Sequence, residues 1–393
     1  MRSFVWMPIF LATATLVYPG EINPTRLSTA GDNAPALRGF AEVATREFGQ
    51  PGARAAAFLF AGMPDTDLRS LSKEFLLENL SLAFRARQEF PWAREVPEDL
   101  FLDFILPYAQ LDEPRDPWRS DFHRRCRVIV KDCKTASEAA MAINTTLFQQ
   151  LGVKYDTGRK RPNQSPKESI EQGKASCTGL SIILADACRS VGIPARLAGI
   201  AKWTHKQGNH TWVEVWDGSW HFAGAAEPSP DGLDHGWFQG DASQAVRDQP
   251  ANAIWANAWA PTQNHFPLAW DPSNTRVPAV NVTEHYAVKP AGLTERGAAI
   301  LHLRVLDDQG QRIVARVGLL DSDGKILRSV TTKAGTADLN DMPALELKPG
   351  GPVTLRVEQG VQARDFPITA RDAGVSTLDL NWSKGTPVKA GTK

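Results

Sequence analysis

Cysteine is scarce in this chain, and neither sign of charge is in excess. The 393 residues include four cysteines, and no two of them form a Cys-x-x-Cys pair. The sequence therefore gives little support for a structural zinc site. Lys and Arg together number 44, as do Asp and Glu, so the formal net charge is zero. A balanced charge gives no electrostatic case for nucleic acid or an anionic membrane surface as a partner.

Long hydrophobic runs are also missing, apart from the N-terminus. Residues 1–20 read MRSFVWMPIFLATATLVYPG, in which Arg2 precedes a mostly apolar run from Phe4 to Val17. Because this run is short for a transmembrane helix, we interpret residues 1–20 as a signal peptide, with a membrane anchor as the alternative. The sequence thus predicts a secreted or periplasmic protein, with membrane association only through this segment.

Export would permit disulfides, and the sequence does not decide whether any of the four cysteines pair. Cys126 and Cys133 are close enough in sequence to pair. The alternative is that Cys126, Cys133 and Cys188 are small buried side chains without a redox role. Hydrophobic residues make up 42% of the chain and charged residues 22%, so we expect globular domains rather than disorder.

The length and the local patterns predict an α+β protein of several parts. Apolar residues recur with a helical period of 3.6 between residues 34 and 108, so we expect a helical N-terminal region over 21–120. Residues 121–290 are the predicted catalytic core. Short alternating runs separated by turns predict an all-β sandwich over 291–385, followed by a frayed tail at 386–393.

Two residues of the core have the local setting of a nucleophile and its base. Cys177 follows the residues GKAS and precedes the helical pattern TGLSIILADA, so it should lie in the first turn of a helix. The free N–H groups and dipole of a helix start favour a thiolate. His210 opens a predicted strand, HTWVEVW, which a turn at Asp217-Gly218 joins to the next strand. An imidazole beside the thiol can accept its proton.

These segments resemble the transglutaminase-like superfamily. The matching stretches are SCTGLS around Cys177, GIPAR at 192–196 and NHTWVEVW at 209–216, and His210 follows Cys177 by 33 residues. The resemblance covers 136–241 and looks like a bacterial, secreted subgroup. It implies a papain-like core, in which the nucleophile's helix packs on an antiparallel sheet that carries the histidine. It also implies acyl transfer at a carboxamide, without a metal or organic cofactor.

The third catalytic residue departs from the pattern that the resemblance implies. Members of the superfamily have Asp-Pro shortly after the second strand of the hairpin, where this chain has Gly224. The nearest equivalent is Glu227-Pro228, three positions later, so we predict Glu227 as the residue that orients His210. Asp217 is interpreted as a turn residue.

The sequence identifies the substrate-binding groups less specifically than it identifies Cys177 and His210. The backbone N–H of Cys177 is one candidate oxyanion donor, and Asn144, Tyr155 and Gln164 are side-chain candidates that the sequence does not separate. Trp203 belongs to an aromatic set that we expect mainly in the core, with a subset near the cleft. We take Trp203, Asn144 and Tyr155 as the candidate substrate-binding residues.

Metal binding is not expected from the sequence. His205, His210, His221 and His235 lie near one another, but their spacing matches no recognisable ligand pattern. The sandwich contains a single histidine, His302, and no cysteine. We therefore expect the sandwich to position the core or contact a partner through its loops, and to leave the thiol's reactivity unaffected.

The sequence as a whole predicts an exported cysteine-dependent enzyme that acts on a protein, peptide or other amide-containing substrate. Hydrolysis by a protease or amidase is favoured over transfer to an amine, because water competes outside the cell. The alternative is a non-catalytic binding or scaffold protein that retains a degenerate core.

Overall fold

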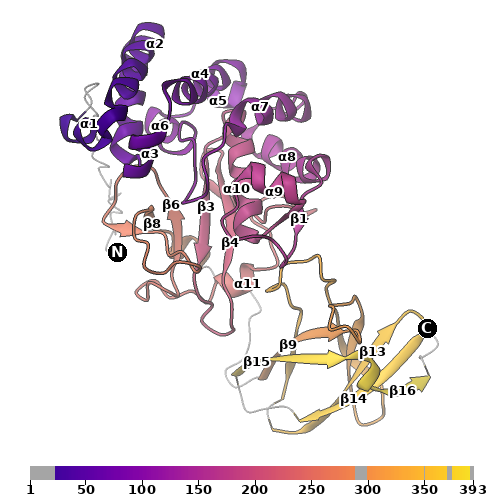
Figure 1. Ribbon diagram of the computed structural model, residues 1–393. Coiled ribbons are helices and arrows are strands. Elements are labelled where there is room, and N and C mark those ends of the chain that lie inside the picture. The colour runs from indigo at the N-terminus through magenta and orange to yellow at the C-terminus, as the bar shows by residue number, and fades with distance from the viewer. Residues whose placement is uncertain (1–22, 288–298, 349, 370–373, 390–393) are drawn as a thin grey trace, which may run out of the picture.

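The computed structural model describes residues 23–287, 299–348, 350–369 and 374–389. The expected signal peptide or anchor at 1–20 lies outside these ranges. Within them, no helix combines the length and apolar character that a bilayer span requires. Figure 1 shows the helical N-terminal part at one end of the molecule, the mixed core in the middle and the β-strands of the C-terminal part at the other end.

Helices form the N-terminal part, as the apolar period predicted. They are α1 (Pro24–Ala30), α2 (Ala34–Gly62), α3 (Asp65–Ser70), α4 (Lys73–Glu89), α5 (Pro91–Arg94) and α6 (Glu98–Phe104). Two further helices, α7 (Trp118–Ile129) and α8 (Ala136–Leu151), contribute to the hydrophobic cluster of the core. In α4, Ser72 caps the first turn by accepting a hydrogen bond from Phe75 N, while Leu76, Leu80 and Ala83 face the core. A short 3-10 helix, η1 (Gly31–Asn33), joins α1 to α2.

The core is built on a six-stranded antiparallel sheet. Its strands are β3 (Ala195–Ile200), β4 (His210–Trp216), β5 (Trp220–Ala223), β6 (Ile254–Asn257), β7 (Asn264–His265) and β8 (Pro278–Asn281), in the spatial order β5-β4-β3-β6-β8-β7. The short elements around it are β1 (Lys154–Tyr155), α9 (Pro166–Gln172), β2 (Lys174–Ala175), α11 (Gln239–Ala242) and α12 (Thr283–Tyr286). The turn at Asp217 and Gly218 joins β4 to β5, as predicted.

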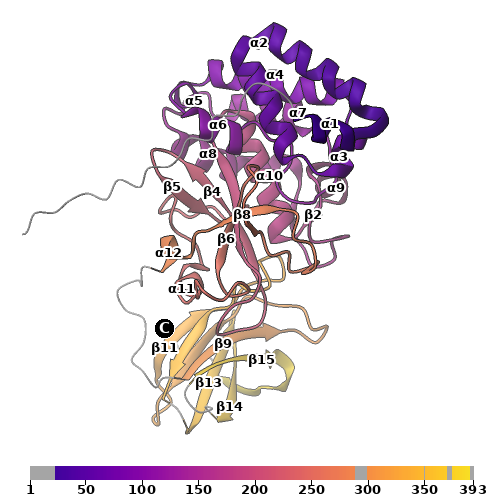
Figure 2. The same cartoon turned by 90° about the vertical axis from the view of Figure 1, so that its left-hand side faces the viewer.

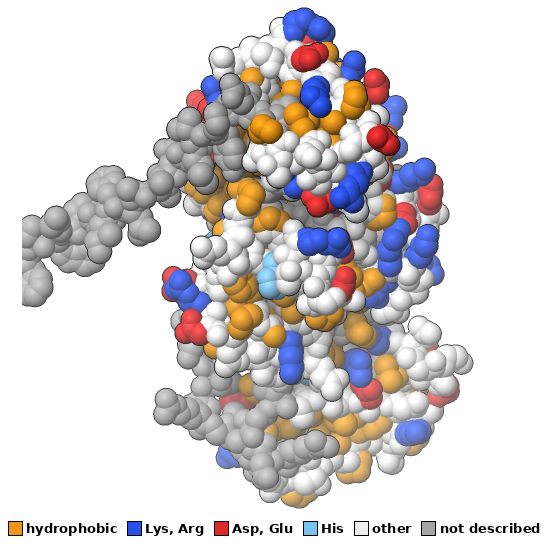
Figure 3. Space-filling model, turned by 60° about the vertical axis from the view of Figure 1, so that its left-hand side comes forward, with side chains coloured by type: hydrophobic (Ala, Val, Ile, Leu, Met, Phe, Trp, Pro, Cys, Tyr) orange, Lys and Arg blue, Asp and Glu red, His pale blue; other side chains and the backbone are white. Residues whose placement is uncertain are grey.

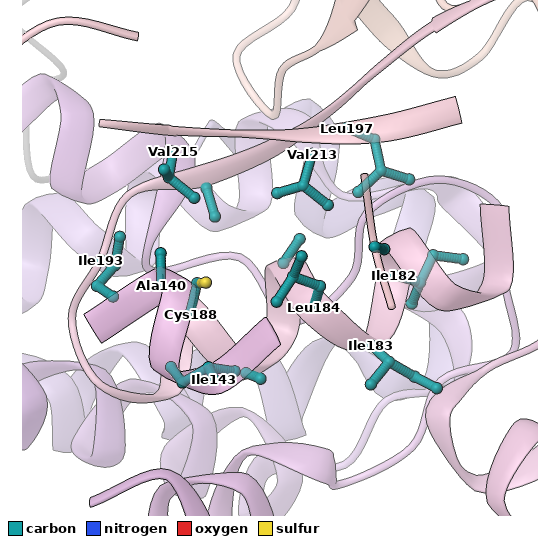
Figure 4. Packing of buried hydrophobic residues seen from close by; sticks show 14 of the residues in the cluster. Ala140, Ile143, Ile182, Ile183, Leu184, Cys188, Ile193, Leu197, Val213 and Val215 are labelled. Carbon is teal, nitrogen blue, oxygen red and sulfur yellow. The ribbon is translucent and has the colours of Figure 1, made fainter. Parts of the chain in front are cut away.

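Helix α10 (Cys177–Ser190) packs against β3 and β4. Figure 4 shows Leu197, Val213 and Val215 pointing from the strands toward Leu184 and Cys188 of the helix. All five side chains are almost completely buried in one hydrophobic cluster. Burying a branched aliphatic side chain of this kind stabilises a fold by about 1.5–3 kcal/mol, so this layer fixes the helix on the sheet.

A buried ion pair lies on the sheet that carries the histidine. Arg196 Nε donates to Glu214 Oε2 at 2.6 Å, and the hydroxyl of Tyr286 donates to Glu214 Oε1 at 2.6 Å. Burial alone would raise the pKa of Glu214, but Arg196, His285 and Tyr286 hold it at about 2. The carboxylate is therefore ionised and fully partnered inside the core.

The C-terminal part is an all-β sandwich, and the α+β class is confirmed. One sheet has the order β11 (Ile326–Thr331), β10 (Arg316–Leu320), β13 (Pro352–Gln359), β14 (Gln362–Thr369) and β16 (Thr386–Lys389); the other has β12 (Ala344–Leu347), β9 (Ala299–Leu306) and β15 (Gly374–Asn381). Leu303, Val317 and Leu355 from the two sheets share one buried cluster. A second 3-10 helix, η2 (Trp382–Lys384), precedes β16.

The predicted tail at 386–393 needs correction in its first half. Residues 386–389 pair with 362–365 of β14 as an antiparallel edge strand. The sequence Thr-Pro-Val-Lys is too short to show alternation, and its pairing partner lies more than twenty residues earlier. Local pattern therefore did not reveal this strand.

The surface agrees with the balanced composition. On the face drawn in Figure 3, acidic and basic side chains are interspersed and no large single-sign patch covers it. Figure 2 shows the sandwich below the end of the central sheet, on the same side as α11. The sandwich thus lies next to the end of the core where β4 begins.

The buried ion pair gives a test of the core. We expect Glu214→Gln to lower the free energy of unfolding by about 3–5 kcal/mol, because it leaves the Arg196 guanidinium without its buried partner. Glu358→Gln is the matched control, since Glu358 pairs with Arg316 at 3.1 Å on the exposed face of the sandwich. That change should cost at most about 1 kcal/mol. Urea denaturation measures both, and equal losses would contradict this account.

Candidate active site

Cys177 is the first residue of α10, as predicted. Ser176 caps the helix, and its hydroxyl oxygen accepts a hydrogen bond from Gly179 N at 3.0 Å. The Cys177 side chain is partly exposed, whereas most of the helix after it is buried. The helix has 14 residues, so its first turn presents free N–H groups and the positive end of a helix dipole to the sulfur.

His210 is the first residue of β4 and is only 2% exposed. Two contacts fix β4 against the first turns of α10. The hydroxyls of Thr178 and Thr211 lie 3.0 Å apart, and the Ser181 hydroxyl donates to Thr211 O at 3.1 Å. Because these residues are neighbours of Cys177 and His210 in the chain, the contacts bring thiol and imidazole together.

The thiol, the imidazole and a third group form a compact triangle. Sγ of Cys177, one ring nitrogen of His210 and a carboxylate oxygen of Asp338 all lie within 4.8 Å of one another. His210 Nδ1 is 3.5 Å from Asp338 Oδ2. This distance is that of an ion pair rather than a well-formed hydrogen bond. Cys177 and His210 therefore meet in space, as their positions in the sequence suggested.

Asp338 comes from the sandwich, in the loop between β11 and β12. It is 1% exposed, and its Oδ1 accepts a hydrogen bond from Asn340 N at 2.8 Å. Arg312 Nη1 holds the Asp338 carbonyl at 2.8 Å, and Asn340 Nδ2 donates to Asn209 O at 2.7 Å. The loop is thus fixed both to the sandwich and to the residue before His210. The sequence did not predict this contact, and whether the sandwich leaves the thiol's reactivity unaffected stays a prediction.

Gly208 makes room for the loop. It has a φ of 102°, a conformation that favours glycine. A Cβ atom at this position would lie 2.0 Å from Asn340 Oδ1, so any larger residue would force the Asn340 side chain to move.

The buried charges in the triangle stabilise one another. Burial alone would lower the pKa of His210, but Asp338 and Cys177 raise it to about 10. Burial alone would raise the pKa of Asp338, but His210 and the amide groups of Asn340 hold it below its usual value. We therefore describe His210 as an imidazolium paired with an ionised Asp338.

Asp338 lies on the thiol's side of the imidazole. In a relay of nucleophile, imidazole and carboxylate, the outer groups sit on opposite ring nitrogens, which separates sulfur and oxygen by roughly 7 Å or more. Here the sulfur and the carboxylate are within 4.8 Å. His210 Nε2 is buried and completes no hydrogen bond with the part of the chain that the structure describes. Asp338 is thus a neighbour of the thiol and not a carboxylate behind the ring.

Glu227, the predicted orienting residue, contacts Trp237, and the Trp237 ring in turn packs against His210. Its Oε2 accepts a hydrogen bond from Trp237 Nε1 at 2.7 Å, and the Trp237 ring centroid is 4.6 Å from that of His210. Burial raises the pKa of Glu227 to about 7, although His210 opposes the shift. Among the described residues, the carboxylate within ion-pair distance of His210 is Asp338 and not Glu227.

Trp203, one of the predicted substrate-binding residues, packs beside the imidazole. Its ring centroid is 6.4 Å from that of His210, and the residue is 1% exposed. Trp212, Trp237 and Phe238 complete an aromatic wall at 4.6–5.8 Å from His210. This wall excludes water from the imidazole and leaves Trp203 little surface for a ligand.

Asn144 and Tyr155, the other two candidates, have different surroundings. Asn144 is buried and holds the loop after β5, since Nδ2 donates to Gly224 O and Oδ1 accepts from Ala226 N, both at 2.8 Å. Tyr155 lies near the triangle: burial raises its pKa, and the charges of Asp338 and Cys177 raise it further. The structure therefore favours Tyr155 over Asn144 as a group near Cys177 and Asp338.

Gln164 and the remaining cysteines lie outside this triangle. Gln164 is fully buried, and its Nε2 donates to Lys174 O at 3.0 Å, just before the helix of Cys177. All four cysteines are free thiols, so Cys126 and Cys133 are not paired. Burial raises the pKa of Cys126 to about 12, and Cys188 is shifted in the same direction for the same reason.

Comparisons with known proteins agree with the motifs. Residues 124–242 match the family model of the transglutaminase-like superfamily. A putative cysteine protease from Cytophaga hutchinsonii is 18% identical over 50% of this chain and 61% of its own, with a TM-score of 0.30. Red sea bream transglutaminase is 13% identical over 76% of this chain and 58% of its own, with a TM-score of 0.24.

No curated protein matches the chain. The chain covers less than two thirds of either solved structure. The match of the family model covers the helix of Cys177, the strand of His210 and the hairpin that follows. Residues 124–242 therefore form a domain of the transglutaminase-like superfamily.

Proposed function

We propose that this protein is a cysteine-dependent acyl-transfer enzyme that hydrolyses a peptide or other amide bond. The observation that carries the proposal is the position of Cys177 at a helix start, within 4.8 Å of a buried imidazole nitrogen. A cysteine in this setting is activated by the helix dipole and by the imidazolium beside it, because both stabilise the thiolate. The family match of residues 124–242 supports the same chemistry.

The reaction follows from the two side chains. His210 already carries a proton, so Cys177 reacts as a thiolate beside the imidazolium, and the sulfur attacks the carbonyl carbon of the amide. When the C–N bond breaks, the imidazolium gives its proton to the leaving amine, and an acyl group remains on the sulfur as a thioester. Water then attacks the thioester with the neutral His210 as the base, which releases a carboxylic acid and restores the thiolate beside the imidazolium.

Two groups near the sulfur are suited to hold the developing oxyanion. The backbone N–H of Cys177 is one of the free donors of the first helical turn. Tyr155 is the second, because its raised pKa keeps the hydroxyl protonated and able to donate. Asn144 is less suitable, since its amide already binds Gly224 and Ala226.

Glu227 takes an indirect part in this proposal. It holds the Trp237 indole, and that ring packs against the imidazole. Glu227 is therefore a positioning residue that fixes the plane of His210 through Trp237. Asp338 stabilises the imidazolium, but its carboxylate is close to the sulfur. An acyl substrate needs that space, so the loop around Asp338 must yield when substrate binds.

A second candidate function is a binding or scaffold role without catalysis. The observation that favours it is the geometry of the carboxylate, which lies beside the thiol, together with the lack of a hydrogen bond from any described residue to His210 Nε2. Thiol reactivity separates the two functions, because an activated cysteine reacts with alkylating agents at a pH where an ordinary thiol is protonated.

Alkylation by iodoacetamide tests the activated thiol. We expect Cys177 to react below pH 7, and His210→Ala to slow this reaction at least about tenfold, because the imidazolium that stabilises the thiolate is lost. Cys133→Ser is the control variant, since Cys133 is the other partly exposed thiol and its pKa is raised by burial and by Glu138. Mass spectrometry of the modified peptide identifies the site. A reaction at Cys177 that begins only above pH 8 and ignores His210→Ala would favour the scaffold function.

The pKa of His210 tests the role of Asp338. With Asp338 present, that pKa is raised to about 10, so the imidazolium persists well above neutral pH. Asp338→Asn removes the charge that stabilises the protonated form, so the pKa should fall and the imidazolium should be lost at a lower pH. NMR titration of the histidine ring measures this shift directly.

Asp341→Asn is the matched control in the same loop. Asp341 pairs with Lys333 at 3.1 Å and makes no ion pair with His210 among the described residues. Its replacement should leave the His210 titration almost unchanged. A fall of equal size in both variants, or in neither, would contradict a specific pairing with Asp338.

A further inference from the structure

A second cluster of ligating side chains lies where the core meets the sandwich. It consists of His205 from the loop after β3, Asp241 from α11 and His302 from β9. One ligand atom from each residue lies within 4.8 Å of the other two. Two members come from the core and one from the sandwich, so the cluster exists only when the two parts are together.

The atoms are close to the arrangement that a metal ion needs. His205 Nε2 is 2.6 Å from Asp241 Oδ1, and the two imidazole centroids are 6.2 Å apart. Bonds of about 2.0–2.2 Å to zinc place neighbouring ligand atoms roughly 3.3 Å apart in a tetrahedral site. Small rotations of these side chains would therefore place all three around one ion.

The other polar atom of each residue is held by a separate group. His302 Nδ1 is 3.2 Å from Met342 O, and His205 Nδ1 is 3.1 Å from the Thr204 hydroxyl. Asp241 Oδ2 accepts a hydrogen bond from the Lys206 ammonium. A histidine that binds a metal is commonly oriented in this way, through a carbonyl or hydroxyl at its second nitrogen. This leaves His302 Nε2, His205 Nε2 and Asp241 Oδ1 for an ion.

The site is also accessible. His205 lines a cavity of about 650 Å³ between the core and the sandwich, together with Lys206, Arg304 and Asn340. An ion can enter through this cavity, and a water molecule can occupy the position that the protein leaves open. His302, in contrast, is 6% exposed, so the inner side of the cluster is closed.

We propose that His205, Asp241 and His302 bind a zinc ion, or a divalent ion of similar chemistry, with a fourth position open to the cavity. Two imidazoles and a carboxylate suit zinc, whereas calcium and magnesium prefer oxygen ligands alone. Lys206 lies close to the carboxylate and repels a cation, which limits the affinity. It does not take the place of a ligand, because it binds the other carboxylate oxygen.

The ion would connect the core to the sandwich loop beside Cys177. Met342, whose carbonyl holds His302, is in the same loop as Asp338, and Lys206 Nζ also donates to Asn340 O at 3.1 Å. Ligands from both parts of the chain would make docking of the sandwich depend on the metal. This follows from the positions of the ligands and does not require the proposed acyl-transfer activity.

Zinc titration of the full chain carrying Cys177→Ala tests the site. The substitution removes the thiol from the other set of possible ligands, Cys177, His210 and Asp338. Isothermal titration should show one equivalent of Zn²⁺, and Co²⁺ should give the visible absorption bands of a nitrogen- and oxygen-ligated ion. His302→Gln or His205→Gln in this background should weaken binding at least about tenfold.

His221→Gln is the matched control. His221 Nδ1 is 2.6 Å from Asp234 Oδ2, the same separation as in the His205 and Asp241 pair, but the described residues place no second histidine in a cluster with it. Its replacement should leave zinc affinity unchanged. His205→Gln is the more informative variant if His302→Gln unfolds, because His205 is partly exposed. Thermal unfolding with and without Zn²⁺ shows whether each variant is folded and whether the ion stabilises it.

Two results would overturn the proposal. One is the absence of saturable zinc binding by the Cys177→Ala chain at micromolar concentrations. The other is binding of equal affinity in the folded His205→Gln variant, which would place the ion elsewhere. Loss of affinity in His205→Gln together with an unchanged His221→Gln would support the site, whatever the outcome of the alkylation experiment on Cys177.

Discussion

The packing of α10 on β3 and β4 is the constraint on which the candidate site depends. Leu184 and Cys188 pack against Leu197, Val213 and Val215, and this contact fixes the helix relative to the strand that begins at His210. The hydroxyl contacts of Thr178 and Ser181 with Thr211 then set the register at the end where the thiol lies. A hydrophobic layer therefore determines a polar geometry, because Cys177 and His210 occupy the ends of elements that the layer holds rigid.

The buried charge of His210 requires a negative partner, which the core alone does not supply among the described residues. An imidazolium buried at 2% exposure is costly without a negative partner, and the partner, Asp338, belongs to the sandwich. The same loop is bound to the core through Asn340 and Asn209. The electrostatic state of the histidine in the core is thus set by a carboxylate that follows it in the sequence by more than a hundred residues.

Local sequence signals predicted the parts of the site that depend on local structure. Cys177 was recognised from a helix start, and His210 from the start of a strand and the hairpin after it. Asp338 and His302 left no such signal, since each meets its partners only through the docking of separate domains and sequence spacing carries no information about that. Glu227 was expected from its place after the hairpin, but the loop that Asn144 holds directs its carboxylate to Trp237. The strand at 386–389 was missed for a related reason, because its pairing is with a strand far away in sequence.

The contact between core and sandwich at Gly208 depends on the absence of a Cβ atom at this position. At this position the backbone of the core approaches Asn340 so closely that a methyl group would overlap its side chain. Substitutions at position 208 should therefore be tolerated less well in the full chain than in a chain that lacks the sandwich. In the full chain, even alanine is destabilising for two reasons, which are its positive φ and its overlap with the Asn340 side chain. Without the sandwich, only the cost of the positive φ remains. Tolerance of substitutions at position 208 therefore shows whether the two domains are docked.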